Sequence, residues 1–233
     1  MLTNIGIEES EGQSMEKIIE QVAEWEFLKK FPQEIFGFTL INELMTCGSQ
    51  YRIFTYNNQQ ARRSFTGLYD EATKDFLVRI VIGLTEFCDI TFFTPDLAAF
   101  EKVLTERMEK TLRQLAIFDP SSVCTQITSK KVLEWPYSAK LPAQIAGFTL
   151  FISPEKPIKA LNGSYVIMDY SDFAAESNLT INYNIFRDEF FGEIRLKRVP
   201  IMITAFDSRT LPDLETKLND NLIPTLENVR LKL

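Results

Sequence analysis

A seventeen-residue segment that occurs twice constrains the fold more than any other feature of this sequence. Residues 24–40 read EWEFLKKFPQEIFGFTL and residues 134–150 read EWPYSAKLPAQIAGFTL, with nine identical positions. The only two tryptophans of the chain, Trp25 and Trp135, fall on equivalent positions of this segment. We therefore predict two copies of one module.

A chain of 233 residues is long enough for two domains of about 100 residues, each with its own core. We place the first copy at residues 13–117 and the second at residues 118–233, and these ranges are called the first half and the second half below. Residues 1–12 are acidic and polar, and we predict a flexible tail there.

The spacing of apolar residues predicts the same order of elements in both halves. In the first half it predicts a helix over residues 15–28, strands over 35–41, 51–56, 64–69, 76–82 and 90–94, and a helix from residue 97 with Asp96 as its N-cap. In the second half it predicts a weaker helix over 123–133, strands over 148–152, 165–170, 179–186, 190–199 and 201–206, and a helix from Thr210 that Pro224 should kink or end.

The connections between the expected strands are of hairpin length, which excludes a doubly wound parallel sheet because parallel crossovers need a dozen or more residues. We therefore predict the α+β class and an internal tandem duplication. Each half should be an antiparallel sheet of about four to five strands, flanked by an N-terminal and a C-terminal helix, and the halves should be related by a pseudo-twofold axis. The two sheets then either join edge to edge or pack face to face.

The residues that define the repeat have a structural interpretation and a functional one. The repeated set is Trp25, Pro32, Gly37 and Phe38 in the first half and Trp135, Pro142, Gly147 and Phe148 in the second. A large aromatic followed by Lys-x-Pro is what a helix-to-strand corner packed into each core would retain, since aromatic side chains supply much of a core's buried area. The alternative is that these aromatics line a ligand groove.

Composition excludes several functional classes. With 25 basic and 32 acidic residues the net charge is −7, which disfavours non-specific binding to nucleic acid or to an anionic membrane. The N-terminus has no signal-peptide pattern and no apolar run approaches the roughly 20 residues of a membrane helix, so we expect a cytoplasmic protein. Three widely spaced cysteines, Cys47, Cys88 and Cys124, indicate neither a disulfide framework nor a zinc site.

The chain contains no histidine, which removes the commonest general base and the commonest transition-metal ligand. It also has no glycine-rich phosphate-binding motif. We therefore assign no catalytic residue, no metal ligand and no cofactor. The favoured hypothesis is a non-catalytic binding or interaction protein, such as an adaptor, a chaperone or an inhibitor. Its partner would be another protein or a small apolar ligand, and a homodimer formed through sheet edges or C-terminal helices is compatible with it.

Polar residues that alternate with apolar ones on two expected strands are the first candidates for a binding surface. These residues are Thr180, Asn182, Asn184, Arg195 and Lys197, which we expect on exposed sheet faces.

The alternative hypothesis is a metal-assisted hydrolase, because hard cations bind convergent carboxylate oxygens. Its acidic residues would be Asp70, Asp75, Asp188 and Glu189, brought together at the cleft between the repeats.

Overall fold

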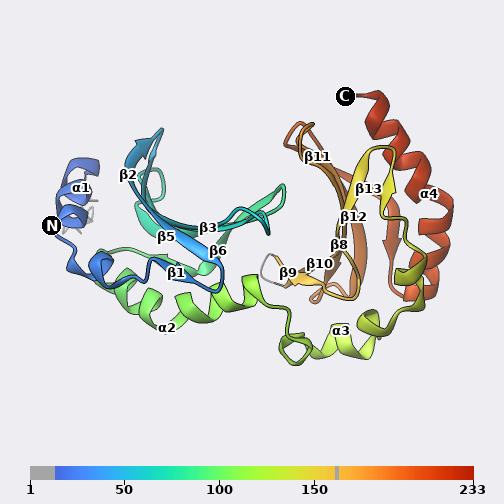
Figure 1. Cartoon of the computed structure of the whole chain (residues 1–233), viewed down its shortest axis with the longest axis horizontal. Helices are drawn as coiled ribbons and strands as arrows, with labels where there is room; N and C mark the ends of the chain where they lie inside the picture. The colour runs from blue at the N-terminus through green and yellow to red at the C-terminus, as the bar shows by residue number, and fades with distance from the viewer. Residues whose placement is uncertain (1–13, 161–162) are drawn as a thin grey trace, which may run out of the picture.

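The computed structural model describes residues 14–160 and 163–233, so the tail predicted over residues 1–12 lies outside the described residues. The chain forms two antiparallel sheets of six and seven strands, and a long helix follows each sheet (Figure 1). The predicted α+β class and the antiparallel strand pairing are confirmed.

The first half forms a sheet whose strand order follows the chain from β1 to β6. Its elements are α1 (Met15–Ala23), the 3-10 helix η1 (Glu26–Lys30), β1 (Glu34–Ile35), β2 (Phe38–Cys47), β3 (Gln50–Asn58), β4 (Arg63–Asp70), β5 (Asp75–Ile82), β6 (Thr85–Thr94) and α2 (Leu97–Ala116). The Asp96 carboxylate accepts a hydrogen bond from the amide of Ala99 at 2.8 Å, as predicted for an N-cap. The first helix ends five residues before its predicted end, because Trp25 adopts an extended conformation.

The second half repeats this plan with a longer entry. Its elements are η2 (Pro120–Ser122), α3 (Thr125–Ser129), η3 (Val132–Glu134), η4 (Pro136–Lys140), β7 (Gln144–Ile145), β8 (Phe148–Ile152), β9 (Ile158–Lys159), β10 (Ser164–Asp172), β11 (Ser177–Asn184), β12 (Glu189–Leu196), β13 (Val199–Ser208) and α4 (Leu211–Leu231). The strand order is β13-β12-β11-β10-β8-β7, and β9 pairs with β10.

The structure differs from the helix predictions of the second half at two points. The helix predicted over residues 123–133 is only the five-residue α3 followed by one turn of 3-10 helix, because Lys131 adopts a left-handed conformation between them (φ 57°). Of the two effects predicted for Pro224, the early end is wrong, because α4 continues to Leu231, and the kink stays a prediction. Pro224 and Asp220 are both exposed, so the Asp220 carbonyl that loses its helical partner faces water.

The repeated glycine lies in a turn of the same type in each half, a few residues after the repeated proline. The segment from this proline to this glycine is called the corner below. Phe36 and Gly37 both have positive φ, as do Ala146 and Gly147, which is the signature of a type I′ hairpin turn. Gly37 therefore lies in a turn between β1 and β2, and not within one continuous strand over residues 35–41 as predicted.

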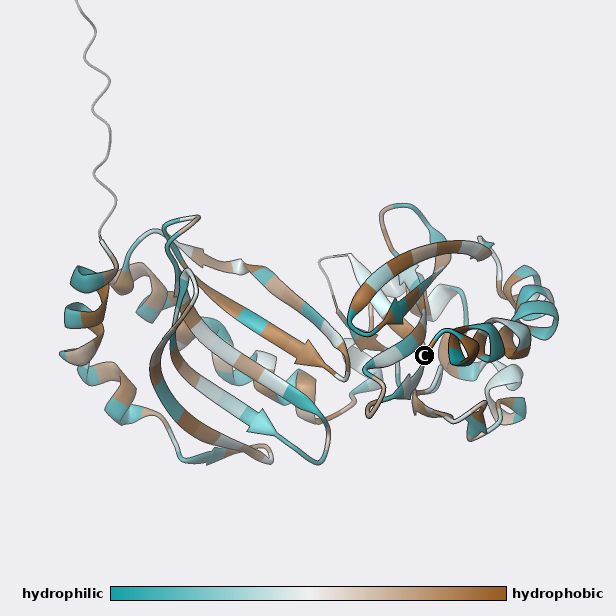
Figure 2. Cartoon of the chain, turned by 90° about the horizontal axis from the view of Figure 1, so that it is seen from above, coloured by the Kyte–Doolittle hydropathy of each residue, from teal (hydrophilic) through white to brown (hydrophobic). Residues whose placement is uncertain are grey.

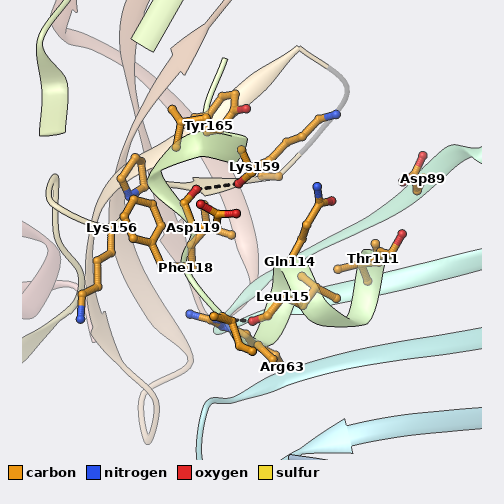
Figure 3. Close-up of a pocket in the computed structure, with 18 of the residues that line it drawn as sticks. Arg63, Asp89, Thr111, Gln114, Leu115, Phe118, Asp119, Lys156, Lys159 and Tyr165 are labelled. Atoms are coloured by element: carbon orange, nitrogen blue, oxygen red, sulfur yellow. Dashed lines mark hydrogen bonds between the residues drawn. The ribbon is translucent and has the colours of Figure 1, made fainter. Parts of the chain in front are cut away.

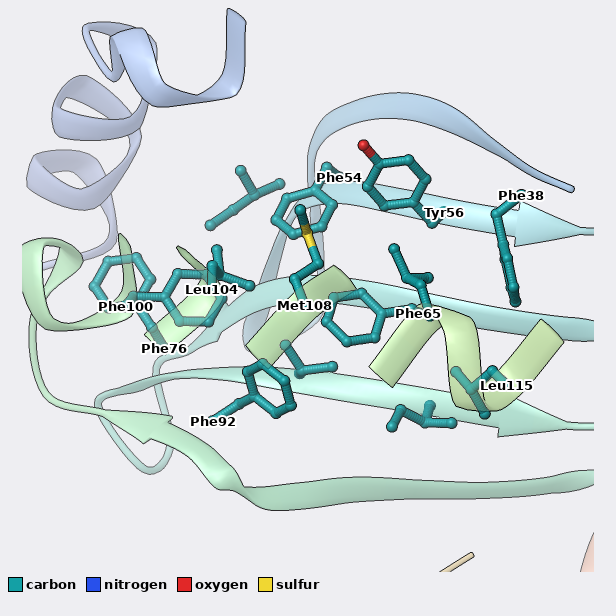
Figure 4. Packing of buried hydrophobic residues seen from close by; sticks show 14 of the residues in the cluster. Phe38, Phe54, Tyr56, Phe65, Phe76, Phe92, Phe100, Leu104, Met108 and Leu115 are labelled. Carbon is teal, nitrogen blue, oxygen red and sulfur yellow. The ribbon is translucent and has the colours of Figure 1, made fainter. Parts of the chain in front are cut away.

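The hydrophobic core of the first half lies between its sheet and α2. Figure 4 shows the side chains that fill this space, among them Phe54, Phe65, Phe76 and Phe100, all completely buried. A second core lies between the second sheet and α4. Figure 2 shows brown apolar and teal hydrophilic residues following one another along the strands and the helices.

The two halves meet through the turns at one end of the first sheet. The Arg62 guanidinium, in the β3–β4 turn, lies 3.9 Å from the centre of the Phe173 ring. Arg195 of β12 donates hydrogen bonds to the Leu84 carbonyl in the β5–β6 turn and to the Thr85 hydroxyl at the start of β6, both at 2.9 Å. The sheets thus join neither edge to edge nor face to face, and β6 and β13 remain terminal strands.

The second half also completes the core of the first. Ile152, Ala160 and Val166 are buried in the same hydrophobic cluster as the first-half residues, and Phe151 and Ile158 pack against that cluster. The junction is therefore an apolar contact surrounded by polar ones.

Candidate ligand-binding site

A cavity of about 270 Å³ lies at the junction of the two halves (Figure 3). Its walls come from strands β4 to β6 of the first sheet, the last two turns of α2, the connection from α2 to α3, and the β9 hairpin of the second half. Figure 3 shows Gln114, Phe118, Lys159 and Tyr165 around this space. Neither half alone encloses the cavity, so its shape depends on how the halves pack.

Much of the wall is apolar and belongs to the shared core. Ile80, Phe87 and Leu115 of the first half are buried in the wall, and Ala160 is buried on the side of the second half. Ile117 and Phe118 of the connection are more exposed. This part of the wall can accordingly contact an apolar group.

One cationic side chain of the wall is partly buried. An Arg63 terminal nitrogen donates a hydrogen bond to the Leu115 carbonyl near the C-terminus of α2, where a cation is favoured by the helix dipole. Burial lowers the pKa of Arg63 below its usual value, yet a guanidinium remains charged in proteins. Its Nε is buried and has no hydrogen-bond partner among the described residues.

The other ionisable groups lie nearer the rim. The Asp89 carboxylate accepts hydrogen bonds from the amide and hydroxyl of Thr91, at 2.9 and 2.8 Å. Hydrogen bonds from Ser121 lower the pKa of Asp119. Lys156 and Lys159 are exposed on the β9 hairpin. These groups at the rim are accessible to solvent. The carboxylates of Asp89 and Asp119 already accept hydrogen bonds from Thr91 and Ser121.

The structure buries two of the residues predicted to form an exposed polar face. Thr180 is 2% exposed and Asn182 is 8% exposed, so that prediction is wrong for both. The physical reason is that this face of the sheet also carries Arg195 of the neighbouring strand, which reaches the first half, so the face is turned toward the rest of the chain. The side-chain amide of Asn182 donates to the Thr180 hydroxyl at 3.0 Å.

The remaining three candidates separate from one another. Asn184 is partly buried and accepts hydrogen bonds from the amides of Phe186 and Arg187, both at 3.0 Å, which closes the β11–β12 turn. Arg195 reaches the first half and also pairs with Glu193 at 2.7 Å. Lys197 is exposed in the β12–β13 turn. The five residues thus form no common exposed surface.

A buried acid beside this junction was missed by sequence reasoning. Asp169 of β10 is 1% exposed and accepts hydrogen bonds from Ser171 at 2.7 Å and from Asn178 at 3.2 Å. Burial raises the pKa of Asp169 to about 7, although these hydrogen bonds and the Arg195 charge act in the opposite direction. The available signal was one acidic residue within the otherwise apolar run Tyr165–Tyr170.

The four carboxylates of the hydrolase hypothesis do not converge on one site, and each lies beside its own neighbours. Asp70 and Asp75 face one another across the β4–β5 turn, at the end of the first sheet that lies away from the second half. Asp188 pairs with Lys130 at 2.7 Å and Glu189 with Arg187 at 2.9 Å. Among the described residues, no group of three or more His, Cys, Asp and Glu is placed to hold a metal ion.

The observations define a two-sheet α+β protein with a cavity between its halves. Comparison with protein-family models, with curated proteins and with solved structures finds no match to this chain. No helix in the described ranges is both long and apolar enough to cross a membrane.

Proposed function

We propose that this protein is a non-catalytic binding protein and that the cavity between its halves holds a small ligand. The observation that carries the proposal is a partly open cavity of about 270 Å³ whose walls come from both halves. Ligand sites occur preferentially at such junctions, and the pockets that hold drug-sized ligands have volumes of roughly 300–1,000 Å³. The ligand of this cavity is accordingly smaller than a typical drug.

The wall is polar and apolar in about equal parts, which supports a ligand with an apolar part and an acceptor or anionic group. Phe87, Leu115 and Ile158 would contact the apolar body. Arg63 supplies the cationic side of the wall, and a partly buried guanidinium interacts with an anion more strongly than an exposed one does.

We further propose that the two halves arose by duplication of one module. Three correspondences support this. The β5–β6 pairing shifts register between Phe76 and Val78, and the β12–β13 pairing shifts between Phe190 and Gly192, each 114 residues later. The indole of Trp25 donates to Glu101 at 2.7 Å, and that of Trp135 donates to Glu215 at 3.2 Å. A tyrosine hydroxyl bonds a proline carbonyl at each corner.

Native mass spectrometry of the gently purified protein, compared with its denatured mass, tests the ligand proposal. We expect a stoichiometric small-molecule adduct, and we expect Gln114→Trp to abolish it because Gln114 is an exposed side chain of the cavity wall. Glu109→Trp, at an exposed position of α2 outside the wall, is the matched control.

A probe molecule covers the case in which the ligand is lost during purification. The anionic dye 1-anilinonaphthalene-8-sulfonate should show enhanced fluorescence with the native protein and with Glu109→Trp, but not with Gln114→Trp. The proposal fails if the unmodified protein has neither adduct nor dye binding, or if Gln114→Trp retains them.

A further inference from the structure

Arg63 carries the one positive charge of the cavity wall that no acidic side chain of the wall balances. The other charged residues of the wall are two lysines and two aspartates, Lys156, Lys159, Asp89 and Asp119, whose charges cancel. Arg63 forms no ion pair among the described residues. The wall therefore has one net positive charge, which favours a ligand with a single negative charge.

The Arg63 guanidinium has two nitrogens left for a ligand. One terminal nitrogen donates to the Leu115 carbonyl, whereas Nε is buried without a partner. The second terminal nitrogen has no hydrogen-bond partner among the described residues either, but it is not fully buried and so gives a ligand access to this side of the guanidinium. Nε and a terminal nitrogen form a planar fork that matches the two oxygens of a carboxylate. Because a buried donor without an acceptor costs free energy, a carboxylate at this fork is favoured.

The volume of the cavity limits the rest of the ligand. Since a cavity of about 150 Å³ binds benzene, one of about 270 Å³ has room for about ten non-hydrogen atoms. The apolar side chains Ile80, Phe87 and Leu115 form a buried part of the wall. Figure 3 shows Arg63 and Leu115 toward one end of the space and Tyr165 toward the other. An extended ligand can thus contact both the guanidinium and the apolar wall.

We propose that the cavity binds a small monocarboxylic acid, with its carboxylate on the Arg63 fork and an apolar chain of about eight carbon atoms in the rest of the space. This inference rests on the proposed function and adds the chemical class of the ligand. A doubly charged phosphate ester fits less well, because Arg63 supplies one charge and the lysines of the rim are balanced by its aspartates.

Octanoate and octanamide are matched probes, because they have the same number of non-hydrogen atoms and only octanoate is charged at neutral pH. In isothermal titration calorimetry the unmodified protein should bind octanoate about tenfold more tightly than octanamide, since a hydrogen bond between charged groups contributes more than one to a neutral group. Gln114→Trp should abolish binding of both probes, because its indole would occupy the cavity.

Substitutions of Arg63 test the role of its guanidinium. Arg63→Met should lower the affinity for octanoate about tenfold and change that for octanamide by less than about threefold. Arg63→Lys keeps the charge but not the fork, so it should weaken octanoate binding without affecting octanamide, and it serves if circular dichroism shows that Arg63→Met does not fold. The matched control is Lys156→Met, which removes an exposed cation of the rim and should keep the full preference.

The outcomes separate this inference from the proposed function. Equal affinities of the unmodified protein for the two probes, a preference for octanoate that survives Arg63→Met, or octanoate binding that survives Gln114→Trp would overturn the carboxylate assignment. Binding of neither probe would overturn it as well, and the adduct and dye measurements described above would then decide the proposed function on their own.

Discussion

Asp169 places an ionisable carboxyl group inside the protein without an opposing charge in direct contact. Its hydrogen bonds come from the neutral Ser171 and Asn178, and its nearest charged influence is Arg195, which already pairs with Glu193. Such an environment favours the protonated acid, because removal from water penalises the charged form most. Three residues later, Asp172 has the opposite environment, since it accepts from the Arg230 guanidinium at 2.7 Å.

Asp169→Asn should stabilise the protein at alkaline pH. The pKa of Asp169 is about 7 in the folded state and about 3.9 when unfolded, so the folded protein binds the proton more tightly. The free energy of unfolding then falls as pH rises from about 4 to about 7. The asparagine variant escapes this loss, and urea denaturation should show a gain of about 2–4 kcal/mol at pH 8 but little change at pH 4.

Asp172→Asn is the matched control with the opposite sign. The hydrogen bond from Arg230 lowers the pKa of Asp172, so its contribution is present at neutral pH and is lost as pH falls below the unfolded value. This variant should therefore be destabilised at pH 8. Equal effects of the two asparagine substitutions at pH 8 would contradict the assignment of Asp169.

At the scale of elements, one tyrosine in each half forms a hydrogen bond to the repeated proline at the corner before the sheet. The Tyr56 hydroxyl on β3 donates to the Pro32 carbonyl at 2.9 Å, and the Tyr170 hydroxyl on β10 donates to the Pro142 carbonyl at 2.6 Å. Both rings are completely buried, and burial raises the pKa of each phenol to about 12. The hydroxyls therefore act as neutral donors at every physiological pH.

Tyr56→Phe and Tyr170→Phe should each lower the free energy of unfolding by about 1–2 kcal/mol, because each leaves a proline carbonyl without its donor. Tyr51→Phe is the control, since Tyr51 is buried but its hydroxyl has no hydrogen-bond partner among the described residues. Chemical denaturation of the three variants is the measurement. A loss for Tyr51→Phe as large as the other two would show that ring packing, and not the corner bond, is responsible.

The spacing of apolar residues predicted those elements in which one face packs against the core of the same half. The alternation in β5 and the stripe on α2 each follow from one face meeting one core. Periodicity also placed Thr180 and Asn182 on one face, but it cannot tell whether that face meets water or another part of the chain. The cavity was not predictable either, because its wall joins Arg63 to Lys159 through contacts distant in sequence.

At the scale of the whole molecule, the contact between the halves makes their stabilities interdependent. Gly83, in the β5–β6 turn, has a φ of +61°, and a Cβ atom there would lie 2.7 Å from the Phe151 ring of the second half. Gly48, in the β2–β3 turn, has nearly the same φ of +62°, and a Cβ atom there would meet nothing within 4 Å. A comparison of alanine substitutions at these two glycines therefore distinguishes the cost of backbone strain from the cost of disturbing the contact between the halves.

Gly83→Ala should destabilise the protein more than Gly48→Ala does. Both substitutions carry the left-handed backbone penalty of about 1–2 kcal/mol, but only the first also displaces Phe151. In differential scanning calorimetry we expect one transition for the unmodified protein and a larger fall in its midpoint for Gly83→Ala. Two separate transitions in the unmodified protein, or equal shifts for the two variants, would show that the halves unfold independently.

The sharing of one core by both halves also bears on how the chain is made. Ile152, Ala160 and Val166 complete a cluster that otherwise consists of first-half residues. Synthesis proceeds from the N-terminus, and domains usually fold as they emerge. On the ribosome, the first half must therefore wait with an uncovered apolar end until β10 has been translated, which makes this interval the period in which the nascent chain most needs protection from aggregation.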